Sequence, residues 1–509
     1  MEAILALDIG TSGAKATLID REGRSLAKAH AGYPLHVDGD QIEQNPLDWW
    51  RAAIDVMREI TAQPVDAAIR AVALTGQMQS VILLEGETVL GQAILYSDMR
   101  AKTEMAEILE LFGEDSLQKI TGNLMDASSI LAKLLWLKRN RASDYARATL
   151  ALLSAHDFIS WKLCGARVTD FTNATTTGML DLEKNAWSEE LFNRLDLRFD
   201  FLPRLEKAEA RIGEISPVMS EMTGVPAGVP VFHGAGDAAT ATIGSAAGEA
   251  GHFYIYLGTS GWLASTGFNQ RIDPGTGFWN LRHPDPQRLI FIGPMLTTAG
   301  NLEWVNEQFG GLEGKAAPGA STYDAIMLQA GHSETGAGGV MYLPHIAGER
   351  CPFRDPSARG VFFGINRQTK RGDLYRAVLE GVALSMRAIR EELMKTLEPK
   401  PVIRELTLAG GGARSALWAQ IFSDVMNCPV NVLSSPEDVG VKGATVIAGK
   451  ALGWYDNFVA PEAFYAFESR FKPNPVAAER YDRQYAVFRD LYPSLKGVFQ
   501  KLGQLTENP

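Results

Sequence analysis

Two short turns made of glycine and hydroxyl residues could hold phosphate. Residues 10–13 read Gly-Thr-Ser-Gly, and the same four residues return at 258–261, 248 positions further along the chain. Such a turn presents successive backbone N–H groups and two hydroxyls that can donate hydrogen bonds to phosphate oxygens. A plain hairpin turn would explain either copy alone. Two copies, each between expected strands, favour an internal duplication with two phosphate cradles.

A third glycine cluster, Gly410-Gly411-Gly412, lies between an expected strand and an expected helix. Apolar residues at i, i+4 spacing over 417–426 place the start of that helix near Ser415. A glycine-rich turn at this position lets a ligand approach the backbone and the helix N-terminus, although the glycines could instead serve close packing alone. The GxxxxGK[ST] pattern does not occur anywhere in the chain, so any ATP site is built without a Walker loop.

Two carboxylates, Asp8 and Asp237, lie at positions where they could take part in phosphoryl transfer. Asp8 comes at the end of the first expected strand, just before the first turn. An anion beside bound phosphate needs a cation between them, which predicts Mg²⁺ held directly or through water; an ordinary turn hydrogen bond is the alternative. Asp237 follows the expected strand 229–233 within Gly-Ala-Gly-Asp. It could act as a general base on a hydroxyl, or simply cap a helix. Lys15 could reach a phosphate or be a surface lysine.

The histidines and cysteines do not predict a metal centre. The three cysteines are far apart and lack CxxC or Cys/His spacing, which is typical of reduced thiols. Three histidines also lack the mutual spacing of metal ligands and are interpreted as structural: His156, His233 and His345.

Composition excludes several classes of partner. The chain has 509 residues, with 49 Lys and Arg against 60 Asp and Glu, so its formal charge is −11. This balance argues against binding to nucleic acid, which needs clustered positive charge. No apolar run approaches the length of about 18 residues that a membrane span requires. We therefore expect a soluble cytoplasmic protein without a membrane or nucleic-acid partner.

Strands alternate with helices along the chain. The pattern predicts a strand hairpin over 4–20, helices over 46–61 and 129–139, a strand over 69–74, and a long helix over 373–397. Residues 203–230 are rich in Pro, Gly and Glu and form an expected irregular connection. The alternation indicates two α/β domains with mixed sheets.

Longer motifs add a family resemblance. Residues 129–137, Ser-Ile-Leu-Ala-Lys-Leu-Leu-Trp-Leu, resemble one signature of the FGGY carbohydrate kinases, which belong to the actin, hexokinase and Hsp70 superfamily. A second signature resembles 360–365 followed by 373–380, and 342–350 resembles the segment before it. The resemblance covers essentially the whole chain and is strongest to the xylulokinase-like branch. It implies two ribonuclease-H-like domains, 1–247 and 248–509, flanking a deep cleft.

The resemblance also implies roles for individual residues. The reaction would be phosphoryl transfer from ATP, with Mg²⁺, to a sugar hydroxyl. By motif position, Asp237 looks like the catalytic base and Asp8 like the acid that works with Mg²⁺. The implied nucleotide contacts are Thr11, Ser12 and Lys15 in the first domain, and Gly258, Thr259, Ser260, Gly410, Gly411, Gly412 and Ser415 in the second.

The expected sugar pocket departs from the family pattern. Its implied contacts are Gln77, Met78, Gln79, Asp98 and Asp237 itself. Xylulokinases usually have His where this chain has Gln79, Trp-Asn where it has Tyr96-Ser97, and Asn where it has Ala238. Each change alters a polar contact to a hydroxyl and so can change discrimination between sugars.

D-Xylulose is the leading substrate that these residues predict. The alternatives are another ketose such as ribulose or a tetrulose, a pentitol, or an aldonate such as gluconate. Glycerol is disfavoured, because the Gln-Arg-Glu of glycerol kinases is missing from this loop. A non-catalytic actin-like nucleotide switch is the alternative from another class. A homodimer is also consistent with the resemblance.

Overall fold

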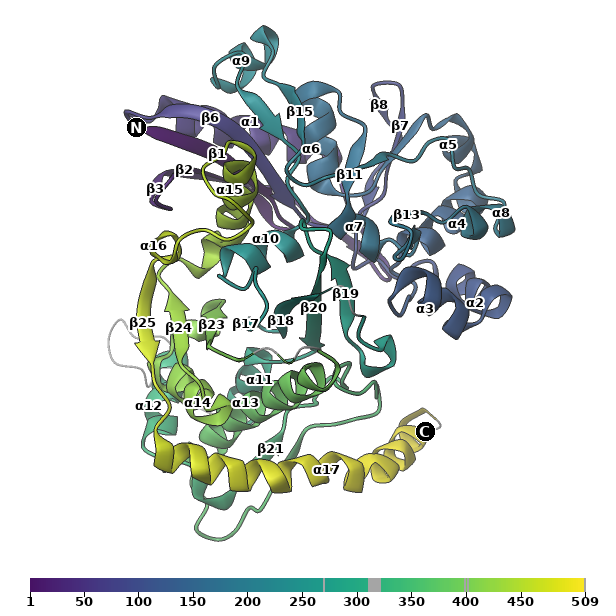
Figure 1. Cartoon of the computed structure of the whole chain (residues 1–509). Coiled ribbons are helices and arrows are strands. Elements are labelled where there is room, and N and C mark those ends of the chain that lie inside the picture. Colours follow the sequence, from purple (N-terminus) through teal and green to yellow (C-terminus); the bar gives the residue numbers. More distant parts are fainter. Residues whose placement is uncertain (269–270, 310–321, 398–399, 401, 508–509) are drawn as a thin grey trace. The chain divides into compact units, whose positions relative to one another are not determined.

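The described chain folds into two compact units. The structure is a computed structural model that describes residues 1–509 except 269–270, 310–321, 398–399, 401 and 508–509 (Figure 1). Unit 1 comprises Met1–Gly248, Trp279–Ile290 and Asp438–Ala466, whereas unit 2 comprises Glu249–Phe278, Phe291–Glu437 and Phe467–Pro509. The expected division after residue 247 lies one residue before the end of the first stretch of unit 1. Two later stretches also belong to that unit.

Unit 1 is built on a six-stranded mixed sheet with the order β15-β16-β6-β1-β2-β3. Strands β1, β2 and β3 pair antiparallel, whereas β6 pairs parallel with both β1 and β16. The strands are β1 (Glu2–Ile9), β2 (Gly13–Asp20), β3 (Ser25–Gly32), β6 (Ala68–Gly76), β15 (Arg211–Glu214) and β16 (Pro230–Phe232). The expected hairpin over 4–20 is therefore confirmed.

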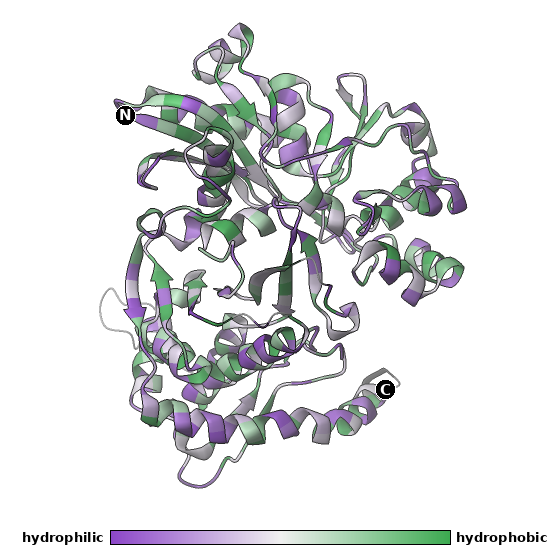
Figure 2. Ribbon diagram, viewed as in Figure 1, coloured by the Kyte–Doolittle hydropathy of each residue, from purple (hydrophilic) through white to green (hydrophobic). Residues whose placement is uncertain are grey.

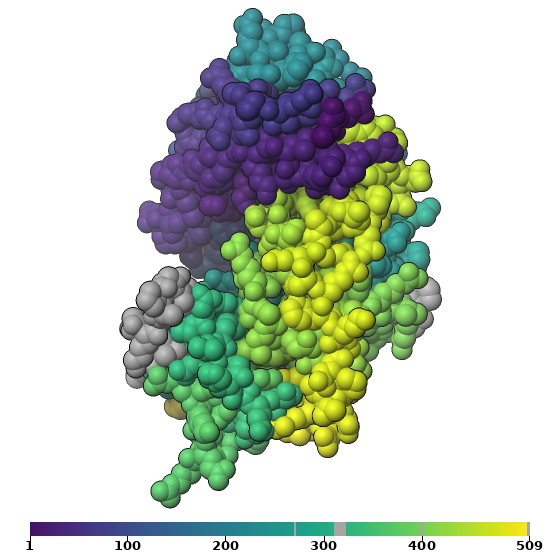
Figure 3. Space-filling view, turned by 90° about the vertical axis from the view of Figure 1, so that its left-hand side faces the viewer, coloured from purple at the N-terminus to yellow at the C-terminus, as the bar shows by residue number. Residues whose placement is uncertain are grey.

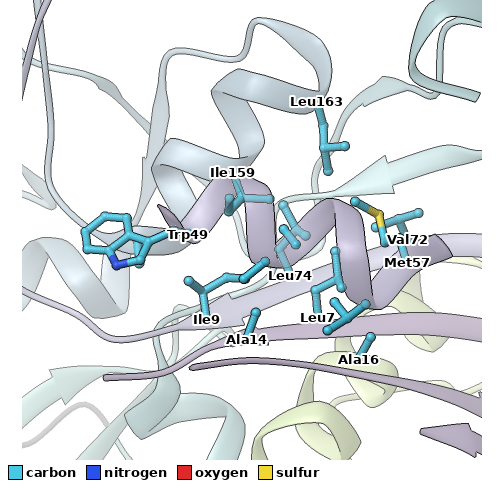
Figure 4. Packing of buried hydrophobic residues seen from close by; sticks show 14 of the residues in the cluster. Leu7, Ile9, Ala14, Ala16, Trp49, Met57, Val72, Leu74, Ile159 and Leu163 are labelled. Carbon is cyan, nitrogen blue, oxygen red and sulfur yellow. The ribbon is translucent and has the colours of Figure 1, made fainter. Parts of the chain in front are cut away.

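The two faces of β1 have different neighbours. Five consecutive residues of β1, Ala3–Leu7, are fully buried, so the strand is covered on both sides. The odd-numbered residues of β1 belong to a core with helices α1 (Pro46–Ala62) and α6 (Ala155–Cys164), which contribute Trp49 and Ile159 (Figure 4). Because successive side chains of a strand point to opposite faces, Asp8 lies on the face away from this core.

Helices α10 (Asp237–Gly244) and α15 (Val439–Ala451) pack closely together in unit 1. A Cβ added at Gly244 would lie 1.9 Å from the carbonyl oxygen of Val439, and one at Gly443 would lie 1.9 Å from that of Thr240. Only glycine allows these helices to approach so closely. Helix α15 also contacts β1 and β6, so a late stretch of the chain lies against the first strands; Figure 3 shows yellow-green atoms beside purple ones there.

A second core of unit 1 lies around a group of helices. Helix α4 (Ile130–Asn140) confirms the helix expected over 129–139; its N-cap is Ser129, and it buries Ile130, Leu134 and Leu137. The other elements around this core are β7 (Ile82–Glu85), α2 (Lys102–Phe112), α3 (Glu114–Thr121), α5 (Ala142–Arg147), β10 (Leu150–Leu152) and α8 (Glu189–Arg194). Strand β19 (Trp279–Arg282) joins unit 1 through hydrogen bonds between Asn280 and Asn123.

Unit 2 repeats the strand arrangement of unit 1. In the order β18-β17-β23-β24-β25, the outer pairs are antiparallel and the two inner pairs are parallel, as in β2-β1-β6-β16-β15. This agreement supports the duplication predicted from the two turns. The strands are β17 (His252–Leu257), β18 (Gly261–Phe268), β23 (Glu405–Ala409), β24 (Val430–Leu433) and β25 (Phe467–Phe471).

Helices pack around the sheet of unit 2. They are α11 (Ala299–Phe309), α12 (Thr322–Gly331), α13 (Arg371–Thr396), α14 (Ala416–Met426) and α17 (Pro475–Glu507). Helix α13 matches the long helix expected over 373–397, and its middle is almost entirely buried. Helix α17 carries a mixture of hydrophilic and hydrophobic residues along its length, as Figure 2 shows.

Candidate active site

Hydrogen bonds to its carbonyl oxygens hold the first glycine turn in place. The pairing of Ile9 with Ala14 closes the turn, and Gly10 N donates to Gly13 O at 3.1 Å. Gln44 Nε2 donates to the carbonyl oxygen of Thr11 at 2.7 Å, and the Tyr33 hydroxyl donates to that of Gly10. Thr11 is partly exposed and Ser12 is exposed. The protein thus binds the carbonyls of the turn and leaves its hydroxyls accessible.

Asp8 and Lys15 lie opposite each other in the β1–β2 ladder. Both are partly exposed. Burial raises the pKa of the Asp8 carboxyl, while the positive charges of Lys15 and His156 oppose that rise. A Cβ added at Gly440 of α15 would lie 3.1 Å from Asp8 Oδ2, so the glycine keeps space beside this oxygen. A partly dehydrated carboxylate with space at one oxygen fits a hard cation such as Mg²⁺.

Asp237 is the first residue of α10. The N-cap is Gly236, and thus the structure does not use Asp237 as the cap. The residue is exposed to solvent, yet the surrounding protein partly dehydrates its carboxyl. This dehydration, together with the negative charge of Asp8, raises the pKa of Asp237 to about 7. A carboxylate of this pKa can accept a proton efficiently near neutral pH.

A pair of threonine hydroxyls joins the elements that carry the two carboxylates. Thr75 Oγ1 and Thr240 Oγ1 lie 2.7 Å apart and are buried. Thr75 is paired with Asp8 in the parallel β1–β6 ladder, and Thr240 is on α10 one turn after Asp237. Sequence reasoning missed this contact, because nothing in the spacing of two threonines 165 positions apart indicates it.

The expected sugar loop, 76–79, lies beside the turn that carries Asp237. A Cβ added at Gly236 would lie 2.4 Å from Met78 Cγ, so Met78 packs directly against that turn. Gln77 Nε2 donates to Gln44 Oε1 at 2.9 Å, whereas Gln77 Oε1 is buried and accepts no hydrogen bond from the described residues. Gln79 has a φ of 58°, and its Nε2 donates to Ser128 O at 3.3 Å.

Asp98 uses both of its carboxylate oxygens inside unit 1. Oδ2 accepts from Ile42 N at 2.6 Å and Oδ1 accepts from Arg100 N at 3.0 Å. The Arg100 guanidinium also pairs with Asp98 and with Glu43, at 2.6 and 2.8 Å. Asp98 therefore holds this loop together, and a direct contact to sugar stays a prediction. Tyr96 is exposed.

The predicted nucleotide loops of unit 2 lie next to each other. The carbonyl oxygens of Gly258 and Thr259 accept from the Thr298 hydroxyl and the Thr298 N–H at 2.6 and 2.8 Å, which leaves Thr259 and Ser260 exposed. Gly410 has a φ of 86°, and a Cβ there would lie 2.7 Å from Leu257 O. The residue must therefore be glycine. Ser415 caps α14 by accepting from Trp418 N.

Two histidines that sequence spacing did not connect are neighbours in unit 1. The ring centroids of His156 and His233 lie 5.0 Å apart, and both rings are fully buried. Asp157 and Asp170 complete a compact group with them. The signal that links these residues is spatial, since they come from α6, the end of β11 (Val168–Asp170) and the segment after β16.

Comparison with known proteins agrees with this geometry. Residues 3–244 match the N-terminal domain, and residues 253–452 the C-terminal domain, of the FGGY family of carbohydrate kinases. The chain belongs to this family. The predicted resemblance is therefore confirmed, and the chain is a sugar kinase with an actin-like ATPase fold that uses ATP as phosphoryl donor.

Individual members of the family match over nearly the full length. The xylulose kinase of Escherichia coli (strain K12) is 30% identical over 500 residues, with 96% of this chain and 99% of that protein covered. The crystal structure of a xylulose kinase from Rhodospirillum rubrum superposes with a TM-score of 0.88 at 27% identity, covering 98% of this chain and 100% of that one. A gluconate kinase structure from Lactobacillus acidophilus has a TM-score of 0.88 at 26% identity, covering 98% and 99%.

Among the described residues, none of the helices is long and apolar enough to cross a membrane.

Proposed function

We propose that this FGGY kinase phosphorylates D-xylulose to D-xylulose 5-phosphate. The observation that carries the chemistry is the position of Asp237, a solvent-accessible carboxyl with a pKa of about 7 beside the expected sugar loop. Full-length similarity to xylulose kinases supports the choice of sugar.

Asp237 acts as the general base. Near neutral pH a large fraction of its carboxyl is ionised, and it accepts the proton of the terminal hydroxyl while that oxygen attacks the γ-phosphorus in line. The bond from the γ-phosphorus to the β,γ-bridging oxygen breaks, and ADP leaves with that oxygen. The Thr75–Thr240 hydroxyl pair fixes α10 to β6, and this contact holds the base in place relative to Asp8.

The exposed hydroxyls and N–H groups of the glycine turns bind the phosphates of ATP. In unit 1 these groups belong to Thr11 and Ser12, with Lys15 as the nearby cation. In unit 2 the corresponding groups belong to Gly258, Thr259 and Ser260. The run Gly410–Gly412, with Ser415 at the start of α14, contacts the adenosine. Preorganised donors of this kind stabilise the charge that develops in phosphoryl transfer.

Asp8 holds Mg²⁺ directly or through a water molecule. Its fit rests on a partly exposed carboxylate and on the space that Gly440 leaves beside Oδ2. When bound, the ion neutralises negative charge on the phosphates.

Gln77, Met78, Gln79 and Asp98 determine the sugar. Gln77 Oε1 is buried and has no hydrogen-bond partner among the described residues, and we propose that a sugar hydroxyl supplies one. Gln79 and Ala238 replace the usual His and Asn, so their contacts to the sugar differ from those of a typical xylulokinase. The similarity to a gluconate kinase makes gluconate the second candidate substrate. A homodimer stays a prediction.

The test is a coupled assay of ADP release with D-xylulose, D-ribulose, a tetrulose, a pentitol and gluconate. We expect the highest kcat/KM with D-xylulose. A sugar that gives a kcat/KM about ten times higher would replace D-xylulose as the substrate without affecting the role of Asp237. ATP hydrolysis that is indifferent to every sugar would instead indicate a nucleotide switch.

A further inference from the structure

Four buried side chains of unit 1 converge on one small space behind Asp237. His156 and Asp157 are on α6, Asp170 ends β11, and His233 follows β16 four residues before Asp237. Each is at most 1% exposed. One nitrogen or oxygen from each lies within 4.8 Å of those of the other three. The group draws together three segments that are remote in sequence.

Two of these atoms lack a hydrogen-bond partner among the described residues. They are His233 Nε2 and Asp157 Oδ1, which face each other at 3.5 Å. Asp157 Oδ1 also lies 3.6 Å from His156 Nε2. Buried polar atoms are almost always satisfied, so two unpartnered atoms facing the same space indicate a missing ligand.

The opposite atom of each side chain is held by a hydrogen bond. His156 Nδ1 and His233 Nδ1 each contact a serine hydroxyl at 2.9 Å, from Ser154 and Ser160. Asp157 Oδ2 accepts from Leu153 N at 3.1 Å, and Asp170 Oδ1 accepts from Thr172 N at 2.8 Å. Hydrogen bonds of this kind on the far side of a ligand fix its orientation toward a metal.

We propose that His156, Asp157, Asp170 and His233 bind a divalent transition-metal ion such as Zn²⁺. Ligands about 2.0–2.1 Å from a tetrahedral ion lie about 3.4 Å from one another. Asp157 Oδ1 lies 3.5 Å from His233 Nε2 and 3.6 Å from His156 Nε2, both close to this value. His156 Nε2 and Asp170 Oδ2 lie closer, at 2.9 Å, in a hydrogen bond that the ion would replace. Two imidazole nitrogens and two carboxylate oxygens suit Zn²⁺ or Co²⁺, whereas Mg²⁺ prefers oxygen ligands alone.

The site is closed and therefore structural. All four coordination positions are supplied by the protein, and burial leaves no position for substrate. Its effect is to tie α6 and β11 to the segment that leads from β16 into α10. Because that segment carries Asp237, the ion positions the base without touching the sugar. It is distinct from the Mg²⁺ of the reaction, which Asp8 holds.

The first experiment measures the metal content of the full-length protein, produced in zinc-supplemented medium and dialysed extensively. We expect about one equivalent of Zn²⁺ per chain, because a closed buried site exchanges its ion slowly. We also expect refolding with Co²⁺ to give the visible absorption of a tetrahedral Co²⁺ complex. Protein that is fully folded and free of metal, without a Co²⁺ spectrum, would overturn the proposal in favour of a plain hydrogen-bonded network.

Variants locate the site. Asp157→Asn keeps the shape of the side chain and the acceptor for Leu153 N, and His233→Ala removes one ligand. Both are expected to lose the bound metal and the Co²⁺ spectrum. His36→Ala, which changes an exposed histidine, is the control and should keep both. Equal metal content in Asp157→Asn and the wild-type protein would refute the assignment.

A second experiment uses only the wild-type chain and so does not depend on whether the variants fold. The wild-type chain is refolded from denaturant with Zn²⁺ or with a strong chelator, and the yield of native protein is compared. We expect a higher yield with Zn²⁺, since a structural metal contributes its binding free energy to folding. The same yield in both would contradict the proposal. Neither readout depends on which sugar the enzyme uses.

Discussion

The two Gly-Thr-Ser-Gly turns have the same sequence but different surroundings. In unit 1 the last strand pair before the turn is Ile9 with Ala14, whereas in unit 2 it is Leu257 with Gly261, so the second loop is one residue shorter. The carbonyls of the first turn are bound by side chains from later in the chain. Those of the second turn are bound by the residues that start α11.

The side chains beside the two turns differ more than the backbones. Asp8 and Lys15 flank the first turn, but the pair Tyr256 and Trp262, stacked with ring centroids 4.3 Å apart, flanks the second. The two turns thus share a similar backbone, while a carboxylate and an ammonium group flank the first copy and two aromatic rings flank the second. We propose that unit 1 carries the acid–base and metal chemistry and that unit 2 contributes hydroxyls and backbone donors.

The strongest test of this difference is Asp237→Asn. We expect kcat to fall by about 10²- to 10⁴-fold, because the amide cannot accept the proton of the sugar hydroxyl. Nucleotide affinity, measured by titration with ATP, should remain nearly unchanged. Near-normal turnover would place the base elsewhere and remove the main distinction between the units.

A smaller effect is expected from Asp8→Asn. The apparent affinity for Mg²⁺ should fall by about 10- to 100-fold, as for other groups that orient or hold a metal. Initial rates as a function of Mg²⁺ concentration measure it, and Asp38→Asn, at an exposed carboxylate, is the control. An unchanged Mg²⁺ dependence would show that the first turn works without its acid.

The glycines of the two turns should differ in how much stability the protein loses when each is replaced by alanine. Added Cβ atoms would lie 2.6 Å from Ala31 O at Gly13 and 2.4 Å from Tyr256 O at Gly261, so substitution by Ala should lower the free energy of unfolding by about 1–3 kcal/mol. At Gly10 the nearest atom is 3.5 Å away, which makes Gly10→Ala the matched control. Denaturant titration decides between these outcomes; equal stabilities would mean that the turns adjust freely.

A buried lysine of unit 1 and a buried arginine of unit 2 should affect the pH dependence of stability differently. Lys133 Nζ donates to Leu95 O at 2.6 Å, and burial lowers the pKa of this lysine to about 7, despite the opposing charges of Asp98 and Asp126. Arg376 of unit 2 pairs with Glu380 at 2.7 Å and stays charged. Between the folded pKa of Lys133 and its unfolded value the unfolded chain binds more protons, so stability rises with pH through this window.

Lys133 is expected to raise the free energy of unfolding by at most about 1.4 kcal/mol per pH unit. This increase stops near the unfolded pKa of about 10.4. The penalty for burying the charge is complete below the folded pKa. Thermal midpoints measured from about pH 7 to about pH 9 should therefore rise more in the wild-type protein than in Lys133→Met. Parallel curves would show that Lys133 does not titrate in this range.

The smallest effect concerns the exposed hydroxyls. Ser12→Ala and Ser260→Ala should each raise the KM for ATP by about 2- to 10-fold, the value of one hydrogen bond, with little change in kcat. Similar values for the two variants would show that the turns are equivalent as phosphate cradles. A large loss of kcat from Ser260→Ala alone would move part of the catalysis into unit 2.

Local patterns were sufficient to predict many elements. The hairpin at the amino terminus, helix α4 from about Ser129, helix α14 from about Ser415, and the long helix α13 all follow from periodicity and turn residues close in sequence. The family motifs predicted the same α/β fold. In each case the information lies within a short stretch of chain.

Contacts between remote segments could not be predicted in this way. Nothing near Asp98 indicates that the backbone N–H of Ile42, 56 positions earlier, donates to its carboxylate. The spacing of His156 and His233 excluded a simple metal motif, although the fold brings them together. Helix α15 and the stretch Trp279–Ile290 belong to unit 1 because they pack against elements that are remote from them in sequence. Local patterns cannot indicate such contacts.

The position of helix α15 has a consequence for synthesis of the protein. This helix, residues 439–451, contacts β1 and β6, which leave the ribosome far earlier. Unit 1 therefore cannot finish folding until most of the chain has been translated, and the first two stretches of unit 2, Glu249–Phe278 and Phe291–Glu437, are made in the meantime. A nascent chain in this state exposes apolar strand surface, which makes it prone to aggregation. We expect its folding in the cell to depend on holding chaperones more than that of a protein with two consecutive domains.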